Sequence, residues 1–425
     1  MMAELLSILN QEVKPALGCT GPTSVAFAAS VARAAVGGAP RSVKVIVDRD
    51  TYKNSVSVGM PGTSKRGLVI ASALGALYGD ATAGLEVLHS VKVESESKAE
   101  LFAQDSVRVE IKWDYEGIGL YIEALVETEK GTGRAIVAKT HANVILEEAN
   151  GVILKQAPAV PKEHLLDHAN DPIRKYTIEE LHAFSRSVPI EQLAFLRDAI
   201  AMNLTLAEKG LHEDLGIGYG PALGRIPGDP AIVRAKALAA SAADLRMAGI
   251  NYPAMSCASS GNVGIAASLP LVAVAEANGS SEEALLRAVC LSFLLTICIK
   301  SHIGRLSAMC ACAIAASLGV TAGTTMLLGG DLANIEAAIG NVAGSIAGVI
   351  CDGAKSGCAL KLATAAGVAI EAAYLSRMGV AIPGNDGIVS STADETIALL
   401  GVIASRGMVE TDRTLCQAII GREKA

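Results

Sequence analysis

The chain has 425 residues, of which 51% are hydrophobic, 3% aromatic and 19% charged, and it contains 42 glycines. This composition excludes a disordered chain and predicts a large core built from small aliphatic side chains. With 36 basic and 43 acidic residues the formal charge is −7, and like charges form no block. We therefore expect no nucleic acid and no anionic membrane surface as partner, and a small-molecule ligand instead.

The start of the chain lacks the features of a secretory signal. Residues 1–14 carry Glu4 early, no basic segment and only a short apolar stretch. The nine cysteines are odd in number and scattered through apolar sequence. In a reducing compartment such cysteines are free thiols or metal ligands, not a disulfide framework. We therefore expect a cytoplasmic protein.

One segment is long enough to cross a membrane. Residues 306–330 contain no charged residue, and a membrane-spanning helix needs about 20 apolar residues. Glycine, serine and threonine are frequent in this segment, however, which disfavours insertion into a bilayer. The sequence predicts a core helix surrounded by other helices, and no membrane association.

Residues 1–165 are predicted to form a mixed α/β domain. Apolar and polar residues alternate, with many β-branched side chains, in five segments: 42–49, 106–113, 118–127, 134–140 and 143–148. A helical pattern over residues 67–87 separates the first two segments. These patterns predict a sheet with helices on one side. Residues 1–38 have a helical pattern and are able to pack on either domain.

From residue 176 to residue 425 the apolar residues follow helical spacing. Capping residues mark several helix starts: Asp229-Pro230, Ser280 with Glu283, and Ser391 with Asp394. Residues 156–175 carry three prolines and many charges and are the expected linker. The predicted fold class is α+β, in which the N-terminal α/β domain precedes a compact all-helical domain, residues 176–425, rich in alanine and glycine.

Five cysteines are candidates for a metal or catalytic site. Cys351 and Cys358 flank a glycine-rich segment, and a break there would turn both thiolates onto one metal or cluster; two buried thiols are the alternative. Cys310 and Cys312 lie two apart in a helical stretch, so at most one should reach a common site, and Cys312 is expected to point away. Cys19 lies between two prolines and two glycines, just before a predicted helix whose dipole favours its thiolate. It is a candidate nucleophile, base or ligand.

Three polar loops and two basic side chains complete the candidate residues. The loops contain Lys53-Asn54, residues 256–264 and residues 384–387. Small side chains and free backbone N–H groups at a helix start suit a substrate carboxylate, while each loop alone is also typical of an ordinary turn. His141 has polar neighbours, and Lys300 brings a cation near Cys310; a surface histidine and a basic helix end are the alternatives.

Six segments together resemble the bacterial and archaeal L-cysteine desulfidase family, which is related to the α chain of iron–sulfur L-serine dehydratases. They are EVKPALGCTGP (12–22), PGTSKRGLVIASALGALYGDATAGLEVL (61–88), PAMSCASSGNVGI (253–265), GRLSAMCA (304–311), VICDGAKSGCALK (349–361) and GNDGIV (384–389). The matches occur in order and cover nearly the whole chain. The resemblance implies a cytoplasmic homodimeric lyase with a [4Fe–4S] cluster and no pyridoxal phosphate, converting L-cysteine to pyruvate, ammonia and sulfide.

Two other functions remain open beside this one. An L-serine dehydratase-type deaminase is the close alternative, and a non-catalytic protein that binds a cluster or an amino acid is the alternative from another class. By motif, the resemblance places cluster ligands at Cys310 and Cys351, with Cys19 or Cys358 as the third. The thiol that does not ligate is a candidate base, followed by Lys300 and His141. The candidate substrate-binding residues are Lys53, Asn54, Ser260, Gly261, Asn262 and Asn385.

The chain departs from the family pattern in two of these segments. The turn after Cys19 is usually Thr-Glu-Pro, and here Gly21 stands in place of the glutamate. In the loop at 256–264, Cys257 and Val263 stand where the family usually has two amide side chains. A carboxylate and two amides are therefore missing from segments expected to hold the substrate.

Overall fold

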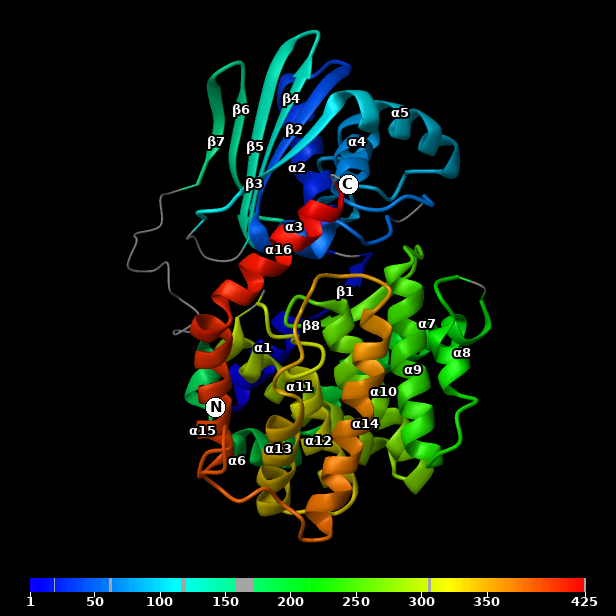
Figure 1. The fold of residues 1–425 in the computed structure, drawn as a ribbon, viewed down its shortest axis with the longest axis vertical. Helices are drawn as coiled ribbons and strands as arrows, with labels where there is room; N and C mark the ends of the chain where they lie inside the picture. The colour runs from blue at the N-terminus through cyan, green and yellow to red at the C-terminus, as the bar shows by residue number, and fades with distance from the viewer. Residues whose placement is uncertain are drawn as a thin grey trace.

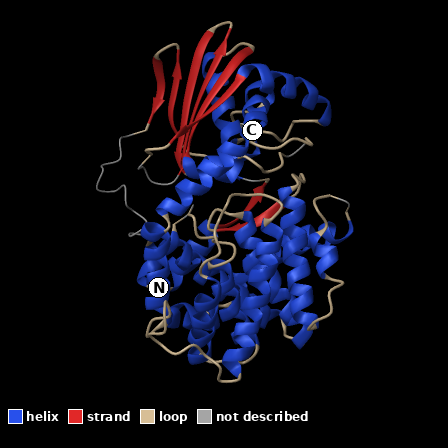
Figure 2. Cartoon of the chain, viewed as in Figure 1, coloured by secondary structure: helices blue, strands red, loops and turns tan. Residues whose placement is uncertain are grey.

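The computed structural model describes residues 1–18, 20–60, 63–115, 120–157, 171–213, 215–304 and 307–423. These residues form a sheet-containing domain and a helical domain that meet end to end (Figure 1). Figure 2 shows the large sheet in one domain and a small two-stranded ribbon near the junction in the other. The predicted α+β class is confirmed.

The large sheet has the strand order β3-β2-β4-β5-β6-β7. Its strands are β2 (Pro40–Asp48), β3 (Val107–Lys112), β4 (Leu120–Thr128), β5 (Gly131–Lys139), β6 (Val144–Ala149) and β7 (Val152–Gln156). The pair β2–β3 is parallel and the other neighbours are antiparallel. The alternating segments thus become strands. The edge strand β7 was not among them, because its first three residues are all apolar and all exposed.

Helices cover one face of this sheet, as predicted. They are α2 (Thr20–Val36), α4 (Leu68–Tyr78) and α5 (Glu96–Ser106). Val43, Val45 and Val47 of β2 are buried beneath them in a shared apolar core. The opposite face carries the ion pair between Arg134 and Glu123, with 2.7 Å between Nε and Oε1.

The second domain is a bundle of closely packed helices. They are α6 (Ile178–Ser187), α7 (Phe195–His212), α8 (Tyr219–Leu223), α9 (Pro230–Met247), α10 (Gly261–Asn278), α11 (Glu282–Ile303), α12 (Ala315–Leu327), α13 (Leu332–Ile346), α14 (Cys358–Arg377) and α15 (Ala393–Val402). The 3₁₀ segments Pro172–Lys175 and Ile190–Leu193 and the π-helical turn Ile403–Gly407 also belong to this domain, whereas the 3₁₀ segments Gly84–Glu86 and Val93–Ser95 belong to the sheet domain. Two described helices, α11 and α14, are long and apolar enough to span a membrane; the most apolar windows of both are more than half buried, at 83% and 56%.

Each domain receives an element from the far part of the chain. Helix α1 (Met2–Glu12) and strand β1 (Val13–Leu17) pack in the helical domain, where β1 pairs with β8 (Pro253–Cys257). In the other direction, α16 (Val409–Glu423) extends onto the sheet domain (Figure 1) and places Ile419 and Ile420 against its core. The expectation that the chain is helical throughout from residue 176 was wrong at β8, because these five residues pair with β1 instead of with a helix.

Candidate active site

A cavity of about 140 Å³ lies where the two domains meet. The sheet domain contributes α2, the helix α3 (Arg49–Ser55), the start of β4 and the turn after β5. Helix α3 replaces the expected loop around Lys53 and Asn54; Asp48 caps it by accepting from Thr51 N at 2.9 Å. The helical domain contributes the ends of α9 and α11, the start of α10, and the segments 307–312 and 351–362. The cavity thus exists only where both domains are present.

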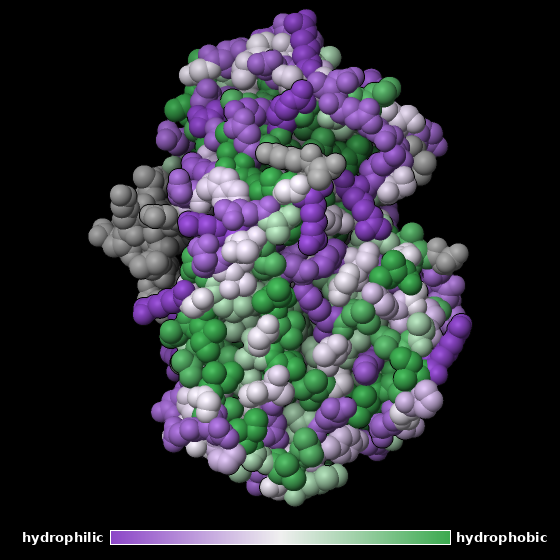
Figure 3. Space-filling model, viewed as in Figure 1, coloured by the Kyte–Doolittle hydropathy of each residue, from purple (hydrophilic) through white to green (hydrophobic). Residues whose placement is uncertain are grey.

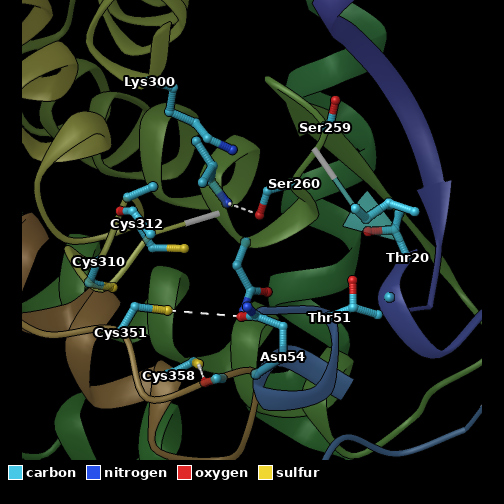
Figure 4. A pocket seen from close by; sticks show the side chains of 18 of the residues that line it. Thr20, Thr51, Asn54, Ser259, Ser260, Lys300, Cys310, Cys312, Cys351 and Cys358 are labelled. Atoms are coloured by element: carbon cyan, nitrogen blue, oxygen red, sulfur yellow. Dashed lines mark hydrogen bonds between the residues drawn. The ribbon is translucent and has the colours of Figure 1, made fainter. Parts of the chain in front are cut away.

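Four thiols line one side of this cavity, namely Cys310, Cys312, Cys351 and Cys358 (Figure 4). Backbone hydrogen bonds fix two of them. Cys310 N donates to Val349 O at 2.9 Å, and Cys351 N donates to Ala308 O at 2.6 Å. Cys358 begins α14, and its Sγ donates to Gly353 O at 3.5 Å. The break between Cys351 and Cys358 that the glycines predicted is therefore present.

Cys312 corrects the geometric expectation made from spacing. Helix α12 begins only at Ala315, and residues 311–314 form a turn, so the helical rule for side-chain direction does not apply. Cys312 instead lines the cavity. A hydrogen bond with Cys312 raises the pKa of Cys310 to about 12, against the opposing effect of a hydrogen bond with Cys351. The thiols therefore lie in mutual contact.

The donors of the cavity do not suit a single metal ion. Among the described residues, no three histidine, cysteine, aspartate or glutamate side chains converge on a single metal ion. Thiols spread along one wall fit a polynuclear iron–sulfur cluster better, because each iron there takes one thiolate. The contact between Cys310 and Cys351 raises the pKa of Cys351 well above its ordinary value, since two adjacent thiols cannot both ionise easily. Bound iron would displace these protons.

Polar side chains occupy the other walls of the cavity. Ser260 caps α10 and accepts from Val263 N at 3.4 Å, and Asn262 lies in the first turn of that helix. Lys300 is buried near the end of α11 and its Nζ donates to Ala258 O at 2.7 Å. Ser260, Asn262, Val263 and Lys300 all line the cavity.

The sheet domain adds two of the predicted residues to the cavity. Cys351 Sγ donates to Asn54 Oδ1 at 3.9 Å, which links the thiol wall to α3 (Figure 4). His141 lies in the turn between β5 and β6, where its carbonyl accepts from Ser24 Oγ at 2.6 Å. The structure thus brings together most predicted site residues: Asn54, His141, Ser260, Asn262, Lys300, Cys310, Cys351 and Cys358.

Four predicted residues are not among those that line the cavity: Cys19, Lys53, Gly261 and Asn385. Cys19 lies outside the described residues. Lys53 is buried behind the cavity in an ion pair with Asp412 of α16. Asn385 bonds with Ser391 in the turn that follows α14; α14 begins at the cavity and is about 30 Å long, so its far end cannot reach the site.

Gly261 lies at the start of α10, between the lining residues Ser260 and Asn262. A Cβ at Gly261 would lie 2.7 Å from Nε and Cζ of Arg246. The glycine therefore allows the guanidinium group to lie directly against the start of α10. Arg246 itself lines the cavity and was missed in the sequence. The available signal was a pair of charged residues, Asp244 and Arg246, in the otherwise apolar last turn of α9.

Gly21 lines the cavity at the start of α2. A Cβ there would lie 2.4 Å from Ser55 Oγ and 3.7 Å from Ser55 Cβ. Ser55 Oγ is buried and has no hydrogen-bond partner among the described residues. The missing carboxylate therefore leaves a hydroxyl pointing at an unfilled position.

The comparisons with known proteins agree with the motifs. The family model described as serine dehydratase alpha chain matches residues 82–417. A UPF0597 protein of Clostridium tetani is 39% identical over 98% of both chains. UPF0597 proteins of Caldanaerobacter subterraneus and Desulfotalea psychrophila are 40% and 38% identical over at least 98% of each chain. The chain belongs to the serine dehydratase alpha chain family.

Proposed function

We propose that the protein is an iron–sulfur-dependent β-elimination lyase that converts L-cysteine to pyruvate, ammonia and sulfide. The observation that carries the proposal is one cavity with four thiols on one wall and amide, hydroxyl and cationic groups on the others. The family relation to serine dehydratases supports a lyase. The thiols are the ligands that an iron–sulfur cluster needs, and the polar groups are the hydrogen-bonding partners that an amino-acid substrate needs.

The residues that would hold the cluster are Cys310, Cys351 and Cys358. Their segments are fixed by backbone hydrogen bonds and by the start of α14, so the thiols are positioned in advance. When bound, such a cluster supplies Lewis-acid chemistry at an iron that carries no protein thiolate. Lys361 lies beside this wall, where its Nζ donates to Ile350 O at 2.7 Å. Lys361 and Lys355 both pair with Asp352, so one positive charge remains to offset part of the negative charge of thiolate ligands.

The chain's own residues bind the substrate and move the proton. Asn262, Ser260 and Asn54 offer hydrogen-bonding groups for the amino and carboxylate groups. A base removes the Cα proton, the released electron pair forms the Cα–Cβ double bond, and the Cβ–S bond breaks so that sulfur leaves as sulfide. The resulting enamine takes up water and yields pyruvate and ammonia, with no change in redox state.

Three side chains are candidates for the base: His141, Lys300 and Cys19. Two of them line the cavity and the third lies outside the described residues. A base acts best when its pKa lies near the operating pH, which for an unperturbed side chain favours histidine. Exchange of the Cα proton in D₂O identifies the base, because its substitution abolishes exchange while the other two variants retain it.

The substrate is assigned on the chemistry of the leaving group. A sulfur leaving group binds iron more readily than a hydroxyl group does, because iron in a thiolate site is relatively soft. We therefore place L-cysteine before L-serine. L-serine remains the substrate that the family description names most directly.

Anaerobic reconstitution with iron and sulfide tests the proposal. We expect about four irons per chain, bleaching in air, and a higher kcat/KM for sulfide release from L-cysteine than for ammonia release from L-serine. The reverse preference would identify a serine deaminase. An intact cluster with no pyruvate from either amino acid would identify the non-catalytic alternative.

Location and assembly are part of the proposal. A cytoplasmic location is supported by the eight described cysteines, all of which are free thiols. A homodimer is supported by apolar side chains exposed on and just after α14, namely Leu360, Leu375 and Met378. Figure 3 shows apolar residues over much of the helical domain on this side. Light scattering of the reconstituted protein measures the mass, and a monomer would contradict the dimer.

A further inference from the structure

Arg246 is a charged residue of the cavity to which the mechanism above gives no role. It lies in the last turn of α9, and only 4% of its surface is exposed. Its Nη1 donates to Asn262 Oδ1 at 3.0 Å, and its Nη2 donates to the carbonyl of Gly18. Its Nε is buried and has no hydrogen-bond partner among the described residues. A guanidinium group has five N–H donors, so this side chain still has donors to offer.

Arg246 also has no ion-pair partner among the described residues. The arginine ion pairs in the described part of the chain involve Arg49, Arg134, Arg197, Arg234, Arg287 and Arg413. Arg246 forms none there. A buried charge without a partner is unfavourable, and an anionic ligand that pairs with it removes this penalty.

The start of α10 lies against the same guanidinium group. Gly261 permits the contact, because a side chain at this position would overlap Nε and Cζ of Arg246. The first N–H groups of a helix have no acceptor within the helix and favour an anion. Two groups that bind anions therefore meet at the wall of the cavity, and one of them is a buried cation that forms no ion pair in the described part of the chain.

We propose that Arg246, with the first turn of α10, binds the α-carboxylate of the substrate. This inference rests on the proposed function and assigns one end of the amino acid to one residue. A planar guanidinium group suits a planar carboxylate better than an ammonium group does. Arg246 therefore selects amino acids over amines that lack the carboxylate.

Two small thiols separate this role from the other contacts of the substrate. 3-Mercaptopropionate keeps the carboxylate and thiol of cysteine but has no amine, whereas cysteamine keeps the amine and thiol but has no carboxylate. Isothermal titration calorimetry of the reconstituted protein under anaerobic conditions measures both dissociation constants. The variant Arg246→Met should weaken 3-mercaptopropionate about 10- to 100-fold, the effect of losing charge-assisted hydrogen bonds. Cysteamine should change less than about 3-fold.

Matched variants keep the experiment decisive. Arg234→Met removes an arginine from the same helix, where it pairs with Glu208 at the surface, and should leave both constants unchanged. If Arg246→Met does not fold, Arg246→Lys keeps the charge and should show a smaller selective loss. Equal weakening of both thiols, or of neither, overturns the proposal. If the unaltered protein releases no sulfide from L-cysteine, the proposed function is refuted. The two dissociation constants still test the role of Arg246 in that case.

Discussion

The ammonium group of Lys53 is wholly buried and pairs with the carboxylate of Asp412, 359 residues further along the chain. Lys53 lies on α3 and Asp412 on α16, so the pair fastens the last helix to the sheet domain. Burial alone would lower the pKa of Lys53, but its interactions with Cys351, Asp50 and Asp412 outweigh burial and raise that pKa above its ordinary value. Asn54, which follows Lys53, contacts the Cys351 thiol. The ion pair therefore stands directly behind the candidate site.

Breaking this pair should destabilise the protein. Asp412→Asn leaves Lys53 buried, with Asp50 as its remaining partner at 3.4 Å. We expect the free energy of unfolding in urea to fall by about 2–4 kcal/mol, somewhat below the usual loss for a broken buried pair. Glu410→Gln on the same helix is the control, because Glu410 is exposed and its one ion pair among the described residues is with Arg413, at 3.6 Å. Equal effects of the two variants would show that the buried pair contributes nothing.

Asp50 should make stability depend on pH. Burial raises the pKa of Asp50 to about 7, whereas an unfolded aspartate has a pKa of about 3.9. Between these values the folded protein holds a proton that the unfolded chain releases, so stability decreases as pH rises, by at most about 4 kcal/mol. Asp50→Asn removes this contribution. The free energy of unfolding of the variant, minus that of the unaltered protein, should therefore grow between pH 4.5 and 7.5; a constant difference would contradict the shift.

The cysteine variants test which thiols hold iron. Cys310→Ser, Cys351→Ser and Cys358→Ser should each lose the cluster, measured as iron content and visible absorption after reconstitution. Cys312→Ser should keep about four irons per chain, because an open iron for the substrate requires one thiol of the wall to remain unbound. Cys290→Ala is the control, since Cys290 is buried and does not line the cavity. Loss of the cluster in Cys312→Ser would argue against an open iron.

Introducing a glutamate at Gly21 should raise activity only if the neighbouring side chain of Ser55 leaves room for it. Gly21→Glu brings a Cβ within 2.4 Å of Ser55 Oγ, whereas Ser55→Ala leaves only an ordinary contact at 3.7 Å. If this carboxylate orients the substrate amine, sulfide release from L-cysteine should rise by up to about 100-fold in the double variant. The single variant Gly21→Glu should gain less. If neither variant releases sulfide faster than the unaltered protein, Gly21 does not limit the reaction. Ser55→Ala alone is the control.

The elements that the sequence predicted best are those whose pattern is local. The strands follow from alternation, and Asp229 caps α9 as Asp229-Pro230 indicated. Two other caps lie one residue further along, at Ser281 and Thr392, because neighbouring serine and threonine residues compete for the same role.

The features that the sequence did not reveal depend on partners far along the chain. The pairing of β8 with β1 joins segments about 240 residues apart, for example Lys14 with Ser256. Spacing misjudged Cys312 because the rule assumed a helix that begins three residues later. Arg246 acquires its significance only through its contact with Gly261. Motifs identified most cavity residues, but their geometry required the packing of two domains.

The exchange of elements between the domains has a consequence for synthesis. Translation supplies β1 early, yet β8, the strand with which it pairs, begins only at residue 253. It supplies α16 after nearly all other described elements, yet this helix completes the packing behind α3. Domains that fold one after another during translation are the usual pattern for long chains, but here the sheet domain is not finished until Asp412 has left the ribosome. Iron loading should therefore follow release of the nascent chain, and separately expressed halves should remain unable to acquire a cluster until they are mixed.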